Sequence, residues 1–486
     1  MANFTGLGLS MAYILIVLGI ASLVAHFTKG ASESSRKLVH ILVGNWVFIT
    51  PLFNDLWAVV LIPFIFIIIN SLSLKFNLIK AMERNDESLG TVYYAVSLFV
   101  LSGAGFILNW PMLPYVGILT MAYGDGLAAV VGQEWGKKKP FSFAKNKTWA
   151  GSIMVGLAAF VATAASIYVL KGDPLMPVVG IPMILVIASL TALIAMFIEL
   201  TGQKGCDNLT LPIGSGLFAS LSVYFGTTGF FAYVGVSIII LLLAFKFRSI
   251  TPDGMVAALL TAITLYSLGG PLLGISLLVF FILGSVVSKI KNSQKEQAES
   301  IQEDTGARSW KQVVANSISA VILVWLAFFF PQKNYLLLLA FTVFSAAAAD
   351  TFSSEIGMLT KGRVFHILTG KTIQNGVSGG VSWMGLAAGL IGSILLSLLT
   401  LPQFGLRGMV FASLMGFLGS ILDSLLGATI QRKYQGIQGQ VQDRSLHLEE
   451  LPTIGYQMIS NNAVNLITLS LVPVLGFGFY NLFMTV

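Results

Sequence analysis

The sequence contains one cysteine, Cys206, and unusually few charged side chains. A single thiol cannot form an intramolecular disulfide or a metal site built from several thiolates, so both are excluded. Charged residues make up only 10% of the chain and hydrophobic residues 56%, which excludes a soluble protein of 486 residues. Neither the Walker A motif nor the Rossmann glycine motif is present, so a bound nucleotide would need a different device.

The hydrophobic residues are gathered in long runs. The first run, residues 11–28, has no basic segment before it and no small-residue cleavage site after it, so we interpret it as a retained helix. Breaks at charged residues, proline and glycine give about sixteen apolar spans, which predicts an all-α, polytopic integral membrane protein. The predicted spans are 11–28, 38–53, 56–74, 91–109, 114–132, 150–170, 179–199, 211–226, 229–246, 254–268, 271–289, 312–330, 334–350, 379–400, 406–431 and 459–484.

Basic residues favour one side of this topology. If the spans alternate, all 28 Lys and Arg residues except Lys171, Lys333 and Arg407 fall on the same side. The positive-inside rule then predicts that the long loops are cytosolic and that both termini lie on the outer side. The predicted location of the protein is the cell membrane. This topology, with a cytosolic anion site, accounts for the net charge of +7 without nucleic acid as a partner.

Two polar stretches at the predicted cytosolic face share one layout. Residues 124–152 and 346–382 each lead from one apolar run to the next through acidic, basic, hydroxyl and glycine residues. The matched positions are Asp125 with Asp350, Gly132 with Gly357, Lys147 with Lys371, and Gly151 with Gly376. We therefore predict two copies of one polar site, in domains 1–227 and 228–486. A cytosolic loop, 289–311, lies inside the second domain, and its hydrophilic part, 289–302, is by composition the best linker.

The first domain places Asp125, Glu199 and Asp207 at the cytosolic ends of apolar spans. An Asp at membrane depth costs about 2.5–3.5 kcal/mol on insertion scales, so Asp125 needs a cation or a water-filled cavity. Lys147 directly precedes a helix start that contains Gly151, an arrangement that suits phosphate. Carboxylates beside such a lysine indicate magnesium–nucleotide chemistry, although Asp207 could alternatively be a simple helix N-cap.

Three further candidates, Arg36, Lys37 and His40, lie at the cytosolic mouth of span 38–53. Anchoring at the membrane surface explains Arg36 and Lys37 equally well. His40 lies inside the apolar run, where an ionisable side chain is usually functional.

The acidic candidates of the second domain are Asp350, Glu355 and Asp423. Asp350 and Glu355 are five residues apart, and on a regular helix they would point about 140° apart. Either the helix breaks between them or they serve different ligands. The nearby candidates for binding an anionic ligand are Arg308, Asn316, Lys361, Lys371 and Gly376.

Several motifs of the first domain resemble one known family. They are Arg36-Lys37-x-x-His40, Gly124-Asp125-Gly126-x-Ala128-x-x-x-Gly132, Lys147-Thr148-x-x-Gly151-Ser152, and Glu199 followed by Asp207-Asn208-Leu209-Thr210-x-Pro212. Their order and spacing over residues 30–225 resemble the phytol kinase and dolichol kinase family of membrane lipid kinases. That family is itself similar to the phosphatidate cytidylyltransferases.

Residues 229–486 resemble a separate family, which includes plant phytyl-phosphate kinase. The matching elements are Arg308 and Asn316, Ala349-Asp350-Thr351-x-x-Ser354-Glu355-Ile356-Gly357, Gly379-Gly380-Val381-Ser382, Gly419-Ser420-x-x-Asp423-Ser424-x-x-Gly427-Ala428, and Asn462-Ala463-Val464-Asn465. The family has a Gly-Thr-Asn-Gly-Gly segment where this chain has Gly376-Val377-Ser378-Gly379-Gly380. The glycines are kept, whereas a hydroxyl and an amide are changed.

The two resemblances imply consecutive steps on membrane lipids. An alcohol kinase would convert a prenyl alcohol of the phytol, geranylgeraniol or farnesol type to its monophosphate, and a second kinase would form the diphosphate. CTP or another nucleoside triphosphate, with Mg²⁺, is the implied phosphoryl donor. In the first domain Asp125, Glu199 and Asp207 would hold metal or activate the hydroxyl, and Lys147, Arg36 and Lys37 would bind phosphate. In the second, Asp350, Glu355 and Asp423 would hold metal, with Lys371, Arg308 and Lys361 on phosphate.

Two other functions fit part of the pattern. A cytidylyltransferase would form a CDP-linked lipid and release pyrophosphate. A lipid or ion transporter would use the repeat and the intramembrane acids, although its binding site is expected near the bilayer midplane rather than at one face. Homo-oligomerisation is left open by the sequence.

Overall fold

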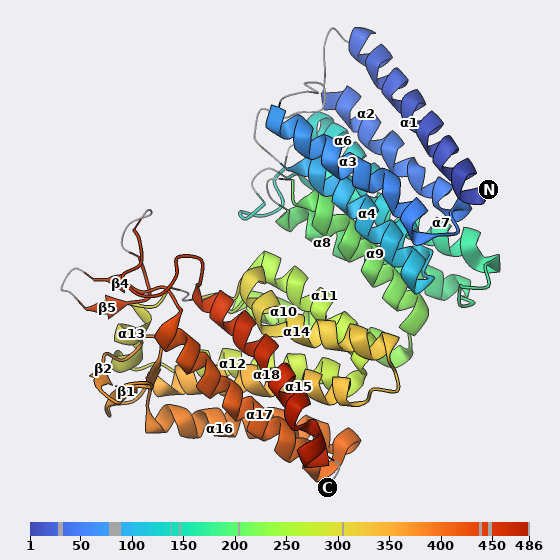
Figure 1. The fold of residues 1–486 in the computed structure, drawn as a ribbon. Coiled ribbons are helices and arrows are strands. Elements are labelled where there is room, and N and C mark those ends of the chain that lie inside the picture. The colour runs from blue at the N-terminus through green and yellow to red at the C-terminus, as the bar shows by residue number, and fades with distance from the viewer. Residues whose placement is uncertain are drawn as a thin grey trace. The chain divides into compact units, whose positions relative to one another are not determined.

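The chain forms two compact helical units, which we call unit 1 (Met1–Thr228) and unit 2 (Gly229–Val486). The computed structural model describes residues 1–27, 33–76, 89–136, 138–144, 147–202, 205–303, 306–436, 440–445 and 450–484. Helices dominate both units, and the strands are short (Figure 1). The domains predicted from the sequence are 1–227 and 228–486.

Unit 1 consists of helices and connecting segments. Its elements are α1 (Ala2–Phe27), α2 (Glu33–Gly44), the 3₁₀ helix η1 (Asn45–Leu52), α3 (Leu56–Phe76), α4 (Gly90–Leu108), α5 (Met112–Leu119), the π-helix η2 (Thr120–Asp125), α6 (Gly126–Trp135), α7 (Trp149–Val169), η3 (Leu170–Gly172), α8 (Ile181–Thr201) and α9 (Asp207–Phe225). Because α5, η2 and α6 follow one another without a break, they make one span with a π-turn in its middle.

Unit 2 adds two small antiparallel sheets to its helices. The helices are α10 (Thr228–Lys246), α11 (Pro252–Gly269), α12 (Pro271–Ser288), α13 (Ser293–Glu299), α14 (Trp310–Phe329), α15 (Tyr335–Gly357), α16 (Trp383–Ser397), η4 (Leu398–Thr400), α17 (Leu401–Thr429) and α18 (Asn461–Met484). One sheet has the order β2 (Thr372–Ile373), β1 (Val364–His366), β3 (Gly380–Val381), and the other pairs β4 (Tyr434–Gln435) with β5 (Val441–Gln442).

Thirteen segments of the described chain are long and apolar enough to cross a membrane. The predicted number of about sixteen is therefore not confirmed. Span 38–53 is divided between the short helix α2 and η1, and span 211–226 corresponds to α9, which opens on a polar turn. Spans 379–400 and 406–431 fall in one continuous apolar segment, Trp383–Thr429, whose backbone turns at Gly405 (φ 63°).

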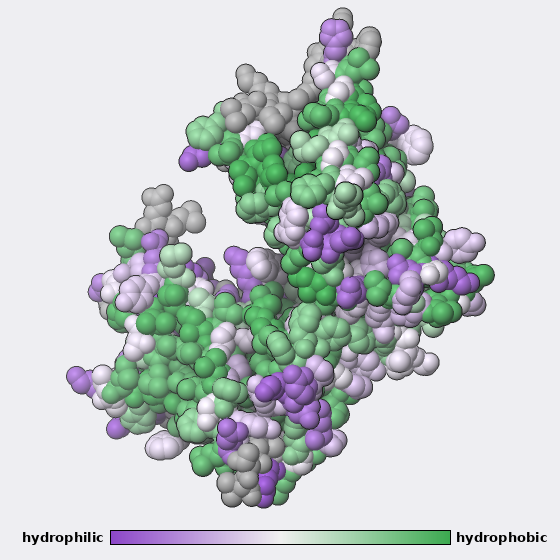
Figure 2. Space-filling model, turned by 45° about the vertical axis from the view of Figure 1, so that its right-hand side comes forward, coloured by the Kyte–Doolittle hydropathy of each residue, from purple (hydrophilic) through white to green (hydrophobic). Residues whose placement is uncertain are grey.

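Hydrophobic side chains cover much of the helical surface, as the face drawn in Figure 2 shows. This is the expected exterior of helices that are solvated by lipid. The centre of unit 2 is α15, since 72% of its apolar window is buried, more than in the other twelve spans of the described chain. It packs against α14, α16, α17 and α18, and it carries two of the candidate acids.

The hydrophilic segment 289–302 does not join the two units, although its composition makes it the best linker. It contains α13 and folds back into unit 2, where Lys295, Ala298 and Ile301 are buried. A polar composition therefore marks a loop here, but not a domain boundary.

Candidate functional site

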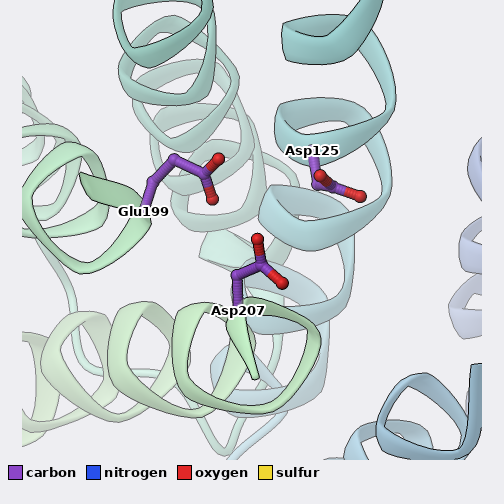
Figure 3. A group of neighbouring side chains, drawn as sticks. All are labelled: Asp125, Glu199 and Asp207. Atoms are coloured by element: carbon purple, nitrogen blue, oxygen red, sulfur yellow. The ribbon is translucent and has the colours of Figure 1, made fainter. Parts of the chain in front are cut away.

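Three carboxylates from three different elements meet in unit 1 (Figure 3). Asp125 ends the π-turn, Glu199 lies in the last turn of α8, and Asp207 opens α9. One ligand oxygen from each side chain lies within 4.8 Å of the others. This grouping is the one cluster of three or more potential metal-ligating side chains in the described part of the chain.

Two lysines balance this acidic cluster. Lys147 Nζ donates to Glu199 and, at 2.8 Å, to Asp207 Oδ2, so it links α8 and α9. Burial alone would lower the pKa of Lys147, but the two carboxylates raise it above its ordinary value, so the ammonium stays charged. Lys37 Nζ donates to Asp125 Oδ2 at 2.6 Å.

His40 also faces Asp125. Its Nε2 lies 3.4 Å from Asp125 Oδ2 and 3.3 Å from the carbonyl oxygen of Met121. The Tyr94 hydroxyl donates to the His40 carbonyl at 2.7 Å, and the two rings meet edge to face. The contacts with Met121 and Asp125 hold α2 against the π-turn, and those with Tyr94 hold it against α4.

The donor set in unit 1 fits a divalent cation. Three carboxylates face two lysines, which leaves a formal charge of −1 (−3 + 2) in a largely buried site. Glu199 is 3% exposed, and its Oε2 is buried without a hydrogen-bond donor among the described residues. Carboxylate oxygens are the ligands that Mg²⁺ prefers, and an unpartnered buried carboxylate oxygen requires a cation or a donor.

The other predicted residues of unit 1 lie at its edge or serve the fold. Arg36 is half-buried near the start of α2. Gly151 donates its backbone N–H to Thr148 Oγ1 (3.2 Å), so this amide caps α7 from within the protein. A Cβ added at Gly151 would lie 3.0 Å from the Ala128 carbonyl oxygen, which shows that α6 and α7 cross closely here.

Unit 2 contains a cavity of about 570 Å³. Six of the predicted residues line it, whereas two predicted lysines, Lys361 and Lys371, are exposed and do not. The six lining residues are Arg308, Asn316, Asp350, Glu355, Gly376 and Asp423. The polar character of the cavity comes from helix ends and from the loop between α15 and α16.

Asp350 and Asp423 lie together at the wall of this cavity. Their carboxyl groups are within hydrogen-bonding contact of each other, and Thr468 Oγ1 donates to Asp423 Oδ1 at 3.2 Å. Two adjacent buried carboxyl groups repel each other when both are ionised, unless a cation or a proton lies between them. The pair therefore fits a divalent cation, as the cluster in unit 1 does.

Glu355 has a different partner. α15 continues unbroken through Asp350 and Glu355, and Glu355 Oε2 pairs with Lys295 Nζ at 2.6 Å. Its Oε1 accepts from Ser288 Oγ at 2.8 Å. Of the two possibilities raised by the sequence, the structure favours different partners for the two acids over a broken helix.

Arg308 is buried and aimed into the cavity. Its guanidinium lies 5.4 Å from the ring centres of Phe280 and Phe281, and its Nη1 has no acceptor among the described residues. Burial lowers the pKa of Arg308, and Glu355 partly offsets this effect. A buried guanidinium with an unused N–H group is a good partner for an anion.

Sequence reasoning missed two charged residues here, Lys295 and Asp443. Lys295 is fully buried and donates to the carbonyls of Ser288 (3.0 Å) and Ile290 (2.9 Å) besides pairing with Glu355. Asp443 lines the cavity and accepts hydrogen bonds from the backbone N–H (3.2 Å) and hydroxyl of Ser378. Burial raises the pKa of Asp443, and Ser378 and Lys433 oppose the shift.

The sequence hints at the contact between Asp443 and Ser378 but not at the contact between Lys295 and Glu355. Ser378 stands where the resembled family has an amide, which marks the position as variable in chemistry. Lys295 lies in a segment that carries both basic and acidic residues and cannot be told from the other charged residues there without the fold.

Comparison with known proteins adds family relationships. Residues 235–472 match the family described as integral membrane protein DUF92. The chain is 32% identical over 205 residues to an uncharacterized membrane protein of Methanocaldococcus jannaschii, covering 42% of this chain and 84% of the relative. It is 29% identical over 204 residues to phytol kinase 1, chloroplastic, of Arabidopsis thaliana, covering 39% and 66%. No solved structure matches.

A phytol kinase relative shows the family of the chain. The chain is 34% identical over 219 residues to the phytol kinase of Synechocystis sp., covering 45% of this chain and 91% of that relative. With its apolar helices and its DUF92 region, the chain is an integral membrane protein. It therefore belongs to the phytol kinase family.

Proposed function

We propose that the protein is a bifunctional membrane kinase of isoprenoid lipids. Unit 1 would phosphorylate a prenyl alcohol, and unit 2 would phosphorylate the resulting monophosphate to the diphosphate. CTP or another nucleoside triphosphate would be the donor in both steps. The observation that carries this proposal is that each unit has its own buried carboxylate site with basic side chains beside it.

The residues of unit 1 suit phosphoryl transfer to a hydroxyl. Mg²⁺, when bound, would neutralise charge on the transferred phosphoryl group, and Asp125 and Asp207 would hold it. Glu199 Oε2, which is buried and has no hydrogen-bond donor among the described residues, would accept the hydrogen bond of the substrate hydroxyl. As the alcohol oxygen bonds to the γ-phosphorus, the bond to the β–γ bridging oxygen breaks and the hydroxyl proton passes to a carboxylate. Lys147 and Lys37 would bind the phosphate oxygens.

The residues of unit 2 suit a phosphate acceptor. Asp350 and Asp423 would hold Mg²⁺, and Arg308 would bind the monophosphate. An ionised oxygen of the monophosphate bonds to the γ-phosphorus, and the nucleoside diphosphate leaves. Lys295 keeps Glu355 in place at the cavity wall.

Separable lesions test the two-site proposal. Asp125→Asn should abolish conversion of the alcohol but spare conversion of added monophosphate, because only the site in unit 1 loses a carboxylate. Asp350→Asn should spare the first step, so that the monophosphate accumulates. The measurement is product identification from purified protein with radiolabelled nucleotide and prenyl substrates. If either folded variant lost both steps, a single shared site would replace the proposal.

The same assay addresses the rival functions. Kinase activity yields CDP from CTP together with prenyl phosphates, whereas a cytidylyltransferase yields pyrophosphate and a CDP-linked lipid. Chelation of divalent cations with EDTA should stop both steps, and added Mg²⁺ should restore them. Protein that consumes no nucleotide with any prenyl alcohol or monophosphate would favour a transporter.

A further inference from the structure

The last five helices of the two units share most of their packing contacts, if α5, η2 and α6 are taken as one helix. In unit 1, α5 packs against α4, α7 and α9, and α8 packs against α7 and α9. In unit 2, α15 packs against α14, α16 and α18, and α17 packs against α16 and α18. The units differ in one contact, because α15 also packs on α17, whereas α5 and α6 make no contact of similar extent with α8 among the described residues. In chain order, therefore, α4, α5–α6, α7, α8 and α9 correspond to α14, α15, α16, α17 and α18.

A close crossing of two helices in unit 1 can be matched residue by residue with a crossing in unit 2. A Cβ added at Gly132 in α6 would lie 2.9 Å from Thr148 Oγ1 and 3.8 Å from Gly151 Cα at the start of α7. Thr148 caps α7 by accepting from the Gly151 N–H. The crossing thus combines a glycine on one helix with a capped glycine on the next.

Unit 2 repeats this crossing between α15 and α16. A Cβ added at Gly357 would lie 3.5 Å from Ser382 Oγ and 3.4 Å from Gly385 Cα, and Ser382 caps α16 by accepting from the Gly385 N–H. The sequences at the two caps are Thr-Trp-Ala-Gly and Ser-Trp-Met-Gly. The spatial counterpart of Gly151 is therefore Gly385, and not Gly376 as the sequence alignment predicted.

This register pairs the acidic residues of the two units. Asp125 and Asp350 each lie seven residues before the crossing glycine, and Asp207 and Asn461 each open the corresponding helix, α9 or α18. The third pair is Glu199 and Asp423. Glu199 follows by three residues Met196, which meets α7 at Gly156, and Asp423 follows by three residues Ser420, which meets α16 at Gly389. Gly156 lies five residues after the capped Gly151 and Gly389 four after Gly385, so this pair matches to within one residue.

One member of the carboxylate cluster is therefore an amide in unit 2. Asp207 can only accept hydrogen bonds when ionised, whereas Asn461 also has an N–H₂ donor. Asn461 lines the cavity together with Arg308 and Asn316. The unpartnered buried groups differ in part: unit 1 has the acceptor Glu199 Oε2, whereas the cavity of unit 2 has the donor Arg308 Nη1 besides the acceptor Asn465 Oδ1.

We propose that this exchange of a carboxylate for an amide determines which substrate each unit phosphorylates. Unit 1 takes a hydroxyl, which donates a hydrogen bond to Glu199 Oε2, and the negative charge of Asp207 disfavours an anionic monoester there. Unit 2 takes a phosphate monoester, whose oxygens accept from Asn461 and Arg308. This inference rests on the proposed function and deepens it by assigning specificity to the position shared by Asp207 and Asn461.

The chemistry of the two steps agrees with this assignment. In unit 1 the O–H bond of the alcohol breaks as the new P–O bond forms, so a carboxylate must accept the proton. In unit 2 the attacking oxygen of the monoester is already ionised, and the nucleoside diphosphate leaves without a proton being taken. A further carboxylate at Asn461 would repel that anion.

The test is Asn461→Asp in the full-length protein, purified in detergent. With CTP and Mg²⁺, the KM for farnesyl monophosphate should rise by about 100-fold or more, because a like charge faces the substrate. Asn461→Gln keeps the amide and should retain most of the affinity. Asn334→Asp makes the same chemical change at an exposed position and should leave the KM unchanged.

Farnesol consumption by the same preparations reports whether unit 1 is folded, and turnover of farnesyl monophosphate at saturating concentration reports the same for unit 2. Wild-type protein that leaves farnesyl monophosphate unphosphorylated would contradict the proposed function itself. Wild-type turnover combined with an unaltered KM in Asn461→Asp overturns only the assignment of specificity. A loss in kcat alone, equal in Asn461→Asp and Asn461→Gln, also overturns it, since that pattern reports a structural role.

Discussion

Some charged side chains of this protein are buried in its interior, where an unpaired charge is costly. Lys295 is 0% exposed, and its ammonium is satisfied by main-chain carbonyls and by Glu355. Removing one partner of a buried ion pair leaves the other charge uncompensated, which is costlier than the pair itself is favourable.

Lys295→Met should therefore destabilise unit 2 strongly. We expect a loss of about 3–5 kcal/mol, since Glu355 keeps its charge but loses its partner. The measurement is the apparent melting temperature of the full-length protein in detergent. Lys291→Met removes a comparable but half-exposed pair with Glu299 and should cost at most about 1 kcal/mol.

Restoring charge balance checks the cause of this loss. Adding Glu355→Gln to Lys295→Met should recover much of the melting temperature, because the uncompensated carboxylate is then neutral. A double variant as unstable as the single one would assign the loss to the packing of the lysine stem instead.

Lys147 gives a prediction for activity. Lys147→Met should lower alcohol phosphorylation by roughly 10²–10³-fold, because one preorganised positive charge at the reacting phosphate is lost. Lys138 lies exposed in the same loop, so Lys138→Met is the matched control and should have no effect. Assays with added monophosphate should show unit 2 unchanged, and a joint loss would argue against two independent sites.

At the residue scale, the sequence could nominate acids but not their partners. Asp125, Glu199 and Asp207 stand out because ionisable residues are rare in apolar runs, and the structure brings these three together. Lys295 cannot be recognised in the same way, because it lies in a charged segment whose neighbours are exposed. Its burial depends on how α13 folds back against α12, which local composition does not encode.

At the scale of elements, glycine contacts decide how closely the loop before α16 approaches α17. Gly379 has φ +87°, and a Cβ there would lie 2.6 Å from Ala428 Cα. Gly370 has φ +67° but nothing within 4 Å. A side chain at Gly370 would therefore meet only the cost of the left-handed backbone, whereas one at Gly379 would meet that cost and a steric clash.

Gly379→Ala should cost about 2–4 kcal/mol, as left-handed strain adds to a backbone clash. Gly370→Ala should cost only about 1 kcal/mol, because strain acts alone. Denaturant or thermal unfolding in detergent gives the comparison. Equal losses in the two variants would mean that the contact with Ala428 relaxes easily.

Apolar runs predicted the helices of this fold well, because long hydrophobic segments have few alternatives in a bilayer. They could not predict that α2 is short or that α9 opens on a polar turn, so that neither helix is among the thirteen long apolar segments of the described chain. The repeat was aligned incorrectly at Gly376 because unit 2 has nine more residues between Asp350 and Ser382 than unit 1 has between Asp125 and Thr148 (32 against 23). The extra residues accommodate strands of two or three residues, which are too short to leave a pattern.

At the scale of the whole molecule, the orientation in the membrane rests on the distribution of basic residues. The single cysteine provides a direct test, because Cys206 is exposed beside Asp207. If the carboxylate sites face the cytosol, a membrane-impermeant maleimide should label Cys206 only after the cells are permeabilised. Cys206→Ser combined with Lys171→Cys moves the thiol to the opposite predicted side and should be labelled in intact cells. The reverse pattern would invert the topology.

The π-turn before Asp125 has a consequence for the state of His40. Both Met121 and Asp125 belong to this turn, and each presents an oxygen to the same ring nitrogen, Nε2. Two acceptors facing one nitrogen require a proton there, so a neutral His40 is the Nε2–H tautomer. Asp125 Oδ2 then receives donors from both Lys37 and His40, so we expect a bound cation to use Oδ1. Nitrogen-15 chemical shifts of the imidazole would identify this tautomer directly.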